Sequence, residues 1–159
     1  MSTREQKLEA LGYPLSKTVK PAAMYDLLAI DGKIIYASGS IPLDGATLVS
    51  IGKVPSDVSL DEAQGAAALC VANIFRTIHA QIGKLSLIER VLRLTGFVNS
   101  APGFTEQHLV INGASQLCID VFGDAGRHAR SAVGVHELPL NASVEVEMIL
   151  KWGQGPIPF

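Results

Sequence analysis

The two longest regular segments of this chain are helical, and they lie among short β-like runs. The first, residues 59–81, begins with SLDE, in which the Ser59 hydroxyl and the Glu62 carboxylate can bond each other's backbone N–H groups. This capping pattern predicts a helix that ends at Gly83. Its apolar residues cover more than one narrow stripe, so we expect it to be well buried. The second helical segment spans residues 105–122.

Alternating or β-branched runs predict the strands, at residues 25–30, 33–37, 47–51, 88–98, 131–136 and 143–150. Asp31-Gly32 predicts a two-residue hairpin turn between the first two runs, and SGSIP at residues 38–42 is expected to be a loop. The order predicts an α+β fold with hairpins at either end, in which one mixed β-sheet carries both helices on a single face. Residues 1–159 are expected to form a single domain, with a helical N-terminal extension at 1–20 and an irregular tail at 152–159.

Few charged residues are available to cover the apolar ones. Hydrophobic residues make up 48% of the 159 residues and charged residues only 18%. No predicted segment remains to cover the second face of the sheet. We therefore expect the chain to associate with copies of itself.

The charge balance disfavours nucleic acid as a partner, because 13 Lys and Arg stand against 15 Asp and Glu. The N-terminus lacks an apolar leader and no apolar run is long enough to span a bilayer, so a cytoplasmic protein without membrane contact is expected. Cys70 and Cys118 are expected to be buried thiols. No metal-spaced His/Cys set or phosphate-binding glycine loop is present, so no metal or cofactor is predicted.

Alternation along the last two predicted strands suggests a binding face. One set, predicted to face away from the helices, consists of Arg130, Ala132, Gly134, His136, Glu145 and Glu147. The opposite set, containing Val133, Val135, Val144 and Val146, is predicted to face the helix-covered core. Small side chains beside an arginine leave room for a ligand, and a guanidinium can grip a carboxylate with two parallel bonds. The alternative is an ordinary solvent-exposed face with Arg130 paired to a glutamate.

Two motifs resemble those of the YjgF/RidA family. ARSAVGVHELPLNASVEVE is similar to the family's C-terminal signature, and SGSIP to its S-G-[QS]-[IVL]-P loop. The resemblance extends from about residue 25 to residue 147. It implies a chorismate-mutase-like subunit, three of which join their sheets into a central barrel with ligand clefts between neighbours.

The resemblance also implies an activity, the hydrolysis of reactive 2-imino and 2-enamino acids to 2-oxo acids and ammonia. Arg130 matches the family's carboxylate-binding arginine and Glu145 the glutamate associated with the attacking water. The remaining substrate-binding positions that it implies are Tyr25, Ser38, Gly39, Asn112 and Ala132. The implied partner is a small carboxylate metabolite, bound by a homotrimer.

Two positions depart from the pattern and keep alternatives open. Ala132 stands where well-studied deaminases carry cysteine, and Gly134 where many carry glutamate. If the backbone carbonyl acts at the first position, alanine can replace cysteine. If the thiol acts, the protein would be a non-catalytic, metabolite-binding or regulatory trimer. The endoribonuclease or translation-inhibitor role attached to the family's name is the least favoured, given the acidic charge.

Overall fold

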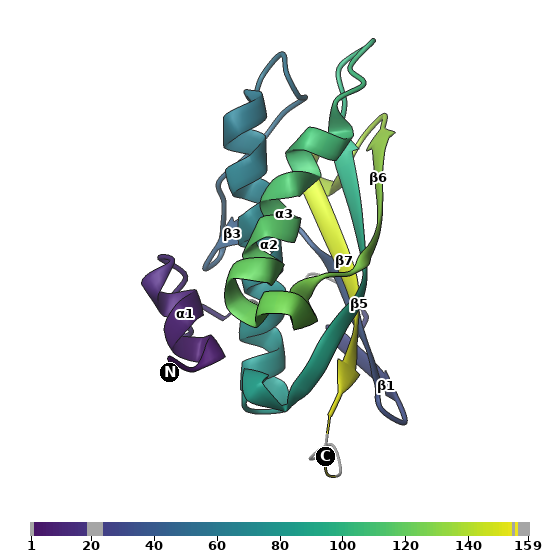
Figure 1. Ribbon diagram of the computed structural model, residues 1–159. Coiled ribbons are helices and arrows are strands. Elements are labelled where there is room, and N and C mark those ends of the chain that lie inside the picture. Colours follow the sequence, from purple (N-terminus) through teal and green to yellow (C-terminus); the bar gives the residue numbers. More distant parts are fainter. Residues whose placement is uncertain (1, 19–23, 154, 156–159) are drawn as a thin grey trace.

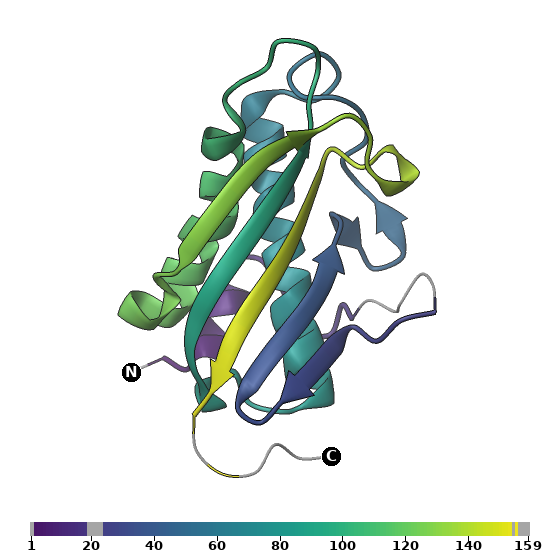
Figure 2. The ribbon, with the colours of Figure 1, turned by 90° about the vertical axis from the view of Figure 1, so that its right-hand side faces the viewer.

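A five-stranded mixed sheet with two long helices against one face forms the body of the protein (Figures 1 and 2). The computed structural model describes residues 2–18, 24–153 and 155. Its elements are α1 (Arg4–Ala10), β1 (Leu28–Asp31), β2 (Ile34–Ser40), β3 (Leu43–Asp44), β4 (Thr47–Leu48), α2 (Leu60–Gln81), η1 (Leu85–Leu87), β5 (Ile88–Asn99), α3 (Gln107–Phe122), η2 (Gly123–Gly126), β6 (Ala129–Val135), η3 (Pro139–Asn141) and β7 (Val144–Trp152).

The strand order of the sheet is β1-β2-β7-β5-β6, and only β5 and β6 run parallel. Helix α2 packs on β2 and β7, and α3 packs on β5 and β6. Figure 2 shows the opposite face, on which no helix of the described residues lies. The predicted α+β fold, with a mixed sheet and both helices on one side, is confirmed.

The first hairpin is present, but its turn lies one residue later than predicted. Asp31 pairs with Ile34, so Gly32 and Lys33 form the turn, and the φ of 57° at Gly32 suits a glycine. The predicted loop at residues 38–42 is partly wrong, because β2 continues to Ser40 through a bulge after Ala37. The bulge disrupts the regular pairing of β2 with β7 at this point.

The second predicted hairpin is wrong. Strands β6 and β7 are consecutive in the sequence, yet β5 lies between them in the sheet. β6 pairs in parallel with β5, and the chain then crosses back so that β7 can pair with β5 on one side and β2 on the other. In this central position β7 pairs with two strands. As the last strand of a hairpin at the edge of the sheet, it would have paired with β6 alone.

Both long helices begin close to their predicted positions. The Ser59 hydroxyl accepts from the Glu62 backbone N–H at 3.2 Å, and the Glu62 carboxylate accepts from the Ser59 N–H at 2.9 Å, so the capping box is confirmed. The helices then pack with their backbones close together. A Cβ on Gly113 of α3 would lie 2.1 Å from the Gln64 carbonyl oxygen of α2.

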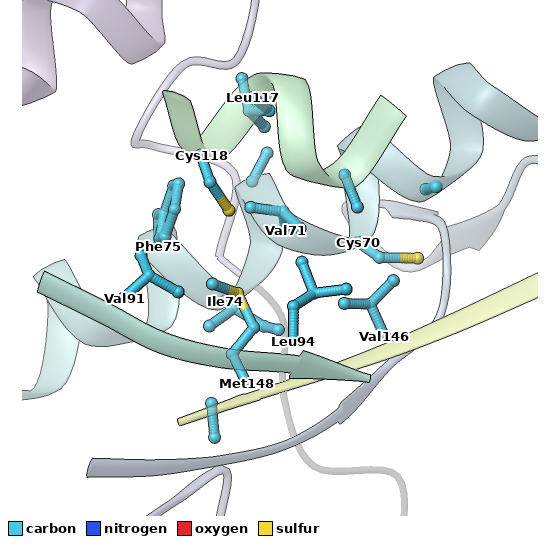
Figure 3. Close-up of a cluster of buried hydrophobic side chains, with 14 of the residues drawn as sticks. Cys70, Val71, Ile74, Phe75, Val91, Leu94, Leu117, Cys118, Val146 and Met148 are labelled. Carbon is cyan, nitrogen blue, oxygen red and sulfur yellow. The ribbon is translucent and has the colours of Figure 1, made fainter. Parts of the chain in front are cut away.

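The core lies between α2, α3 and the sheet (Figure 3). Ile74 and Phe75 of α2 meet Leu94 of β5 and Met148 of β7 in this layer, and all four are buried. Cys70 and Cys118 lie here as free, fully buried thiols, as predicted. Burial raises the pKa of both thiols, which keeps them protonated and unreactive.

Helix α1, in the described part of the N-terminal extension, packs on the outer side of the two long helices (Figure 1). Leu8 of α1 is fully buried, and Arg4 donates to the carbonyl oxygens of Leu85 at 2.9 Å and Ile88 at 2.5 Å. The Arg4 guanidinium also lies 4.4 Å from the centre of the Phe122 ring. Helix α1 therefore stabilises the helix layer and lies far from the open sheet face.

The C-terminal strand extends further than predicted. Trp152, placed in the irregular tail by the sequence, ends β7 and is only 1% exposed. Most of the remaining tail, like residues 19–20 of the N-terminal extension, lies outside the described residues. In the described part of the chain, no helix is both long and apolar enough to cross a membrane.

Candidate functional site

The residues implied by the resemblance fall into two separate groups. Arg130, Asn112 and Ala132 lie where the edge strand β6 meets α3. Tyr25, Ser38, Gly39 and Glu145 lie around a groove beside β2 and β7. We call the first group, with Ser115 and His128, the Arg130 cluster, and the second the Glu145 groove.

The guanidinium of Arg130 is held by three acceptors on α3. Nη1 donates to the Asn112 side-chain oxygen at 2.9 Å and to the Ser115 hydroxyl at 3.1 Å, and Nη2 donates to the His108 carbonyl oxygen at 3.2 Å. A guanidinium has five N–H donors, so one on Nε and one on Nη2 have no partner among the described residues. These two free N–H groups are available to donate to the oxygens of a carboxylate.

His128 helps to position Arg130 by contacting the Ser115 hydroxyl. The sequence did not indicate this role. Its Nδ1 lies 2.6 Å from the Gly126 carbonyl, which can only accept, so Nδ1 carries the proton of the neutral ring. Nε2 then accepts from the Ser115 hydroxyl at 3.1 Å, and the Ser115 oxygen remains free to accept from Arg130. Burial lowers the pKa of His128, and the nearby Arg130 cation lowers it further, against the opposing effect of the Gly126 bond.

The small residues after Arg130 make room for the chain's own side chains. Ala132 packs against the core, and a Cβ on Gly134 would lie 2.7 Å from both the Gln107 amide nitrogen and the Ser100 hydroxyl. The Gln107 amide donates to that hydroxyl at 3.2 Å. The prediction that these small residues leave space for a ligand on their own side of the sheet is therefore wrong. Any contribution of Ala132 to binding must come from its backbone, which lies at the sheet edge.

The Glu145 groove is a hollow with a volume of about 690 Å³. Its walls are mainly apolar, and the residues that supply them include Leu27, Ile41, Leu43, Ile74, Pro139 and Leu140. Tyr25, Ser38 and Glu145 add polar groups, and the Ser38 hydroxyl donates to the Asp26 carbonyl oxygen at 2.7 Å. A mainly apolar groove with a few polar groups is typical of small-molecule sites.

Glu145 is half-buried at the edge of this groove. Burial raises the pKa of its carboxyl group, and the neighbouring Glu147 carboxylate raises it further. A raised pKa makes a carboxylate a better proton acceptor at neutral pH. Glu145 therefore has the properties of a general base.

The Arg130 cluster and Glu145 lie on opposite faces of the sheet. Residues directly opposite each other on neighbouring strands share a face. Arg130 pairs across with Leu94, a core residue below α3, whereas Phe97 stands between Glu145 and Val133 on the uncovered face. The registers separate Arg130 and Glu145 by two strands and three residues, about 14 Å between Cα atoms.

The sequence predicted that Arg130 shares a sheet face with Glu145 and Glu147, and this prediction is wrong. The glutamates share their face with the valines of β6, and Val133 is 44% exposed there. His136, which the sequence placed with Arg130, lies beyond the end of β6 with its side chain 93% exposed. The histidine that is linked to the arginine, through the Ser115 hydroxyl, is His128, two residues before Arg130. Ser115 was detectable in principle, because it lies three residues after Asn112 on the same helix face.

No three histidine, cysteine or carboxylate side chains gather as a metal site within residues 2–18, 24–153 and 155.

Comparison with known proteins matches residues 5–151 to the family described as "YjgF/chorismate mutase-like, putative endoribonuclease". Protein TCP17 of Trypanosoma cruzi is 39% identical over 145 residues, which cover 91% of each chain. The crystal structure of Atu1372 from Agrobacterium tumefaciens is 44% identical, with a TM-score of 0.87 over 96% of this chain and 93% of that one. The fold also occurs in E. coli TdcF, solved with bound serine, at 22% identity and a TM-score of 0.60 over 85% of this chain and 93% of that one.

Proposed function

This chain belongs to the YjgF/chorismate mutase-like family, and we propose that it binds small carboxylate metabolites and hydrolyses 2-imino or 2-enamino acids to 2-oxo acids and ammonia. The observation that carries this proposal is the hydrogen bonding of the Arg130 guanidinium. Three acceptors on α3 fix its guanidinium, and two of its N–H donors have no partner among the described residues and can bind a carboxylate. The serine bound to TdcF, an amino acid with such a carboxylate, fits the same class of ligand.

The reaction requires little beyond orientation and one proton acceptor. Arg130 holds the carboxylate of the substrate, which presents the imine carbon to a water molecule next to Glu145. As the water oxygen forms its bond to that carbon, the C=N π bond breaks, Glu145 accepts a proton from the water, and the nitrogen takes up a proton from solvent to give a carbinolamine. Glu145 then returns its proton to the nitrogen, the C–N bond breaks to release ammonia, and the hydroxyl loses its proton to solvent as the carbonyl of the 2-oxo acid forms. General-base assistance of this kind is worth roughly 10²–10⁴-fold in rate.

We further propose that each site forms between two subunits of a homotrimer. Within one chain, Arg130 and Glu145 lie on opposite faces of the sheet and cannot reach one substrate. In a closed ring of three copies, the Arg130 cluster of one subunit can face the Glu145 groove of the next. The helix-free sheet face and the unpaired edge of β6, as the described residues show them, provide surfaces for such contacts.

The test compares wild type with Arg130→Ala and with Arg130→Lys, which keeps the charge and removes the fork. An amino-acid oxidase generates imines in situ, and the rate of ammonia release is measured. Calorimetry with 2-oxobutyrate measures binding separately. Loss of a charge-assisted pair of hydrogen bonds should weaken acid binding by roughly 10- to 100-fold in the alanine variant.

The two measurements distinguish the enzyme from a binding protein. Imine hydrolysis that is equally fast in wild type and Arg130→Ala refutes the proposed reaction. Binding of 2-oxobutyrate that depends on Arg130, without turnover of any imine, leaves a metabolite-binding protein. Degradation of RNA by both proteins, surviving further purification, would instead support an Arg130-independent nuclease.

A further inference from the structure

Leu140 combines two features that a folded protein ordinarily avoids. Its backbone is left-handed, with a φ of 56° and a ψ of 20°, and Asn141 follows with a φ of 56°. This conformation suits glycine or asparagine and is unfavourable for leucine, because its Cβ lies too close to the following carbonyl oxygen. The Leu140 side chain is also 70% exposed, so it gains little from burial in this chain.

The loop around Leu140 is held in place by contacts that do not involve its side chain. The Asn141 side-chain oxygen accepts from Asn99 at 3.0 Å, and the Asn141 carbonyl oxygen accepts from the Gly52 N–H at 2.8 Å. Asn99 is fully buried and also accepts from Lys53 at 2.8 Å. Strain of this kind persists where surrounding contacts fix the backbone, and it often marks a functional position.

Leu140 forms part of the wall of the Glu145 groove. It lines this groove together with Pro139, Tyr25 and Glu145. An exposed apolar side chain here continues the apolar wall formed by residues such as Leu27 and Leu43. A bound molecule with an apolar substituent would bury this surface, and this burial would offset the cost of keeping a leucine in a left-handed loop.

We propose that Leu140 is a specificity-determining residue that contacts the side chain of the bound acid and selects branched apolar side chains over short ones. This inference rests on the proposed function, since it assigns the substrate class of the same site. An imine with a leucine-like side chain should be preferred over one derived from alanine. One additional apolar contact of this size commonly changes discrimination by about tenfold.

The test uses Leu140→Gly and Leu140→Asn, two residues that adopt the left-handed conformation more easily than leucine. Both variants should be at least as stable as wild type against denaturant, so loss of selectivity cannot be attributed to misfolding. The ratio of kcat/KM for leucine-derived and alanine-derived imines should fall about tenfold in each. Leu11→Asn, which changes a leucine that is 45% exposed at the end of α1, serves as the matched control and should leave the ratio unchanged.

Binding and assembly measurements separate this proposal from the proposed reaction. If wild type hydrolyses neither imine, the reaction fails, and calorimetry with 4-methyl-2-oxopentanoate and pyruvate tests Leu140 directly. The ratio of their Kd values should then show the same tenfold change. A ratio that stays unchanged overturns the proposal. A ratio that changes only together with the molecular mass of the assembly also overturns it and makes Leu140 a subunit contact. Wild type that binds neither acid also overturns it.

Discussion

Gly39 and Glu145 lie so close that the carboxylate of Glu145 occupies the space a side chain at position 39 would need. A Cβ built on Gly39 would lie 1.9 Å from Glu145 Oε1. Gly39 lies in the bulge of β2, between Ala37 and Ser40, where the register with β7 shifts. The absence of a side chain at one residue thus sets the position of the proposed base on the neighbouring strand.

Gly39→Ala should therefore reduce activity while preserving the fold. The Glu145 carboxylate is the end of a flexible side chain, so it can move away from the new methyl group at small cost. Displacing the base should lower kcat/KM for imine hydrolysis by roughly 10²-fold or more.

Thermal unfolding checks the fold of this variant, and Gly65→Ala is the control. A methyl group at position 65 would meet no atom of a neighbouring element within 4 Å, so the activity of the control should be unchanged. A Gly39→Ala protein with wild-type kcat/KM would contradict the role given to Glu145.

Mixing two inactive variants should restore activity if each site spans two subunits. Arg130→Ala and Glu145→Gln would be unfolded together and refolded as a mixture. Each mixed trimer then contains one site with both residues intact, so equal mixing should give about a quarter of wild-type activity. Each variant refolded alone is the control. A mixture as inactive as its components, despite confirmed mixed assembly, would contradict the shared site.

The raised pKa of Glu145 should appear in the pH dependence of the reaction. The base acts as a carboxylate, so kcat/KM should rise with pH through the pKa of Glu145, which burial and Glu147 hold above the ordinary value of 4.5. Glu147→Gln removes a neighbouring negative charge and should move this rise to lower pH. Initial rates from about pH 4 to about pH 8 measure the shift. A profile that is identical in wild type and Glu147→Gln would show that another group controls the reaction.

His128 should make the stability of the protein depend on pH. Its pKa is lower in the folded state than the ordinary value of 6.5, so folding favours the neutral ring. This contribution is fully present above pH 6.5 and is lost as the pH falls through the lower folded-state pKa. Denaturant unfolding from about pH 7.5 to about pH 5 should show a smaller decrease in stability for His128→Gln than for wild type.

His136→Gln provides the control for this measurement, because the His136 side chain is 93% exposed. Its stability should follow the wild-type curve across the same pH range. If His128→Gln also follows that curve, the Ser115–His128 contact does not depend on the neutral ring.

Local patterns determined most of the secondary structure and the family. The SLDE capping box located the start of α2, and apolar alternation separated the two side-chain sets along β6 and β7. The motifs at SGSIP and ARSAVGVHELPLNASVEVE pointed to Arg130, Glu145 and the loop residues. These signals are short-range, since each depends on residues within one or two turns or along one strand.

Only the tertiary structure decided which strands are neighbours and which sets share a face. Alternation shows which residues of one strand share a face. It does not show which residues of another strand lie on that same face, because this depends on strand order and register. Because β5 lies between β6 and β7, Arg130 faces α3 while Glu145 faces the uncovered side. The contacts of Ser115, His128 and Leu140 likewise depend on how α3, β6 and the β6–β7 connection pack. Long-range pairing and packing therefore fixed the geometry of a candidate site of which Arg130, Asn112 and Glu145 were already recognisable in the sequence, whereas His128 and Leu140 were not.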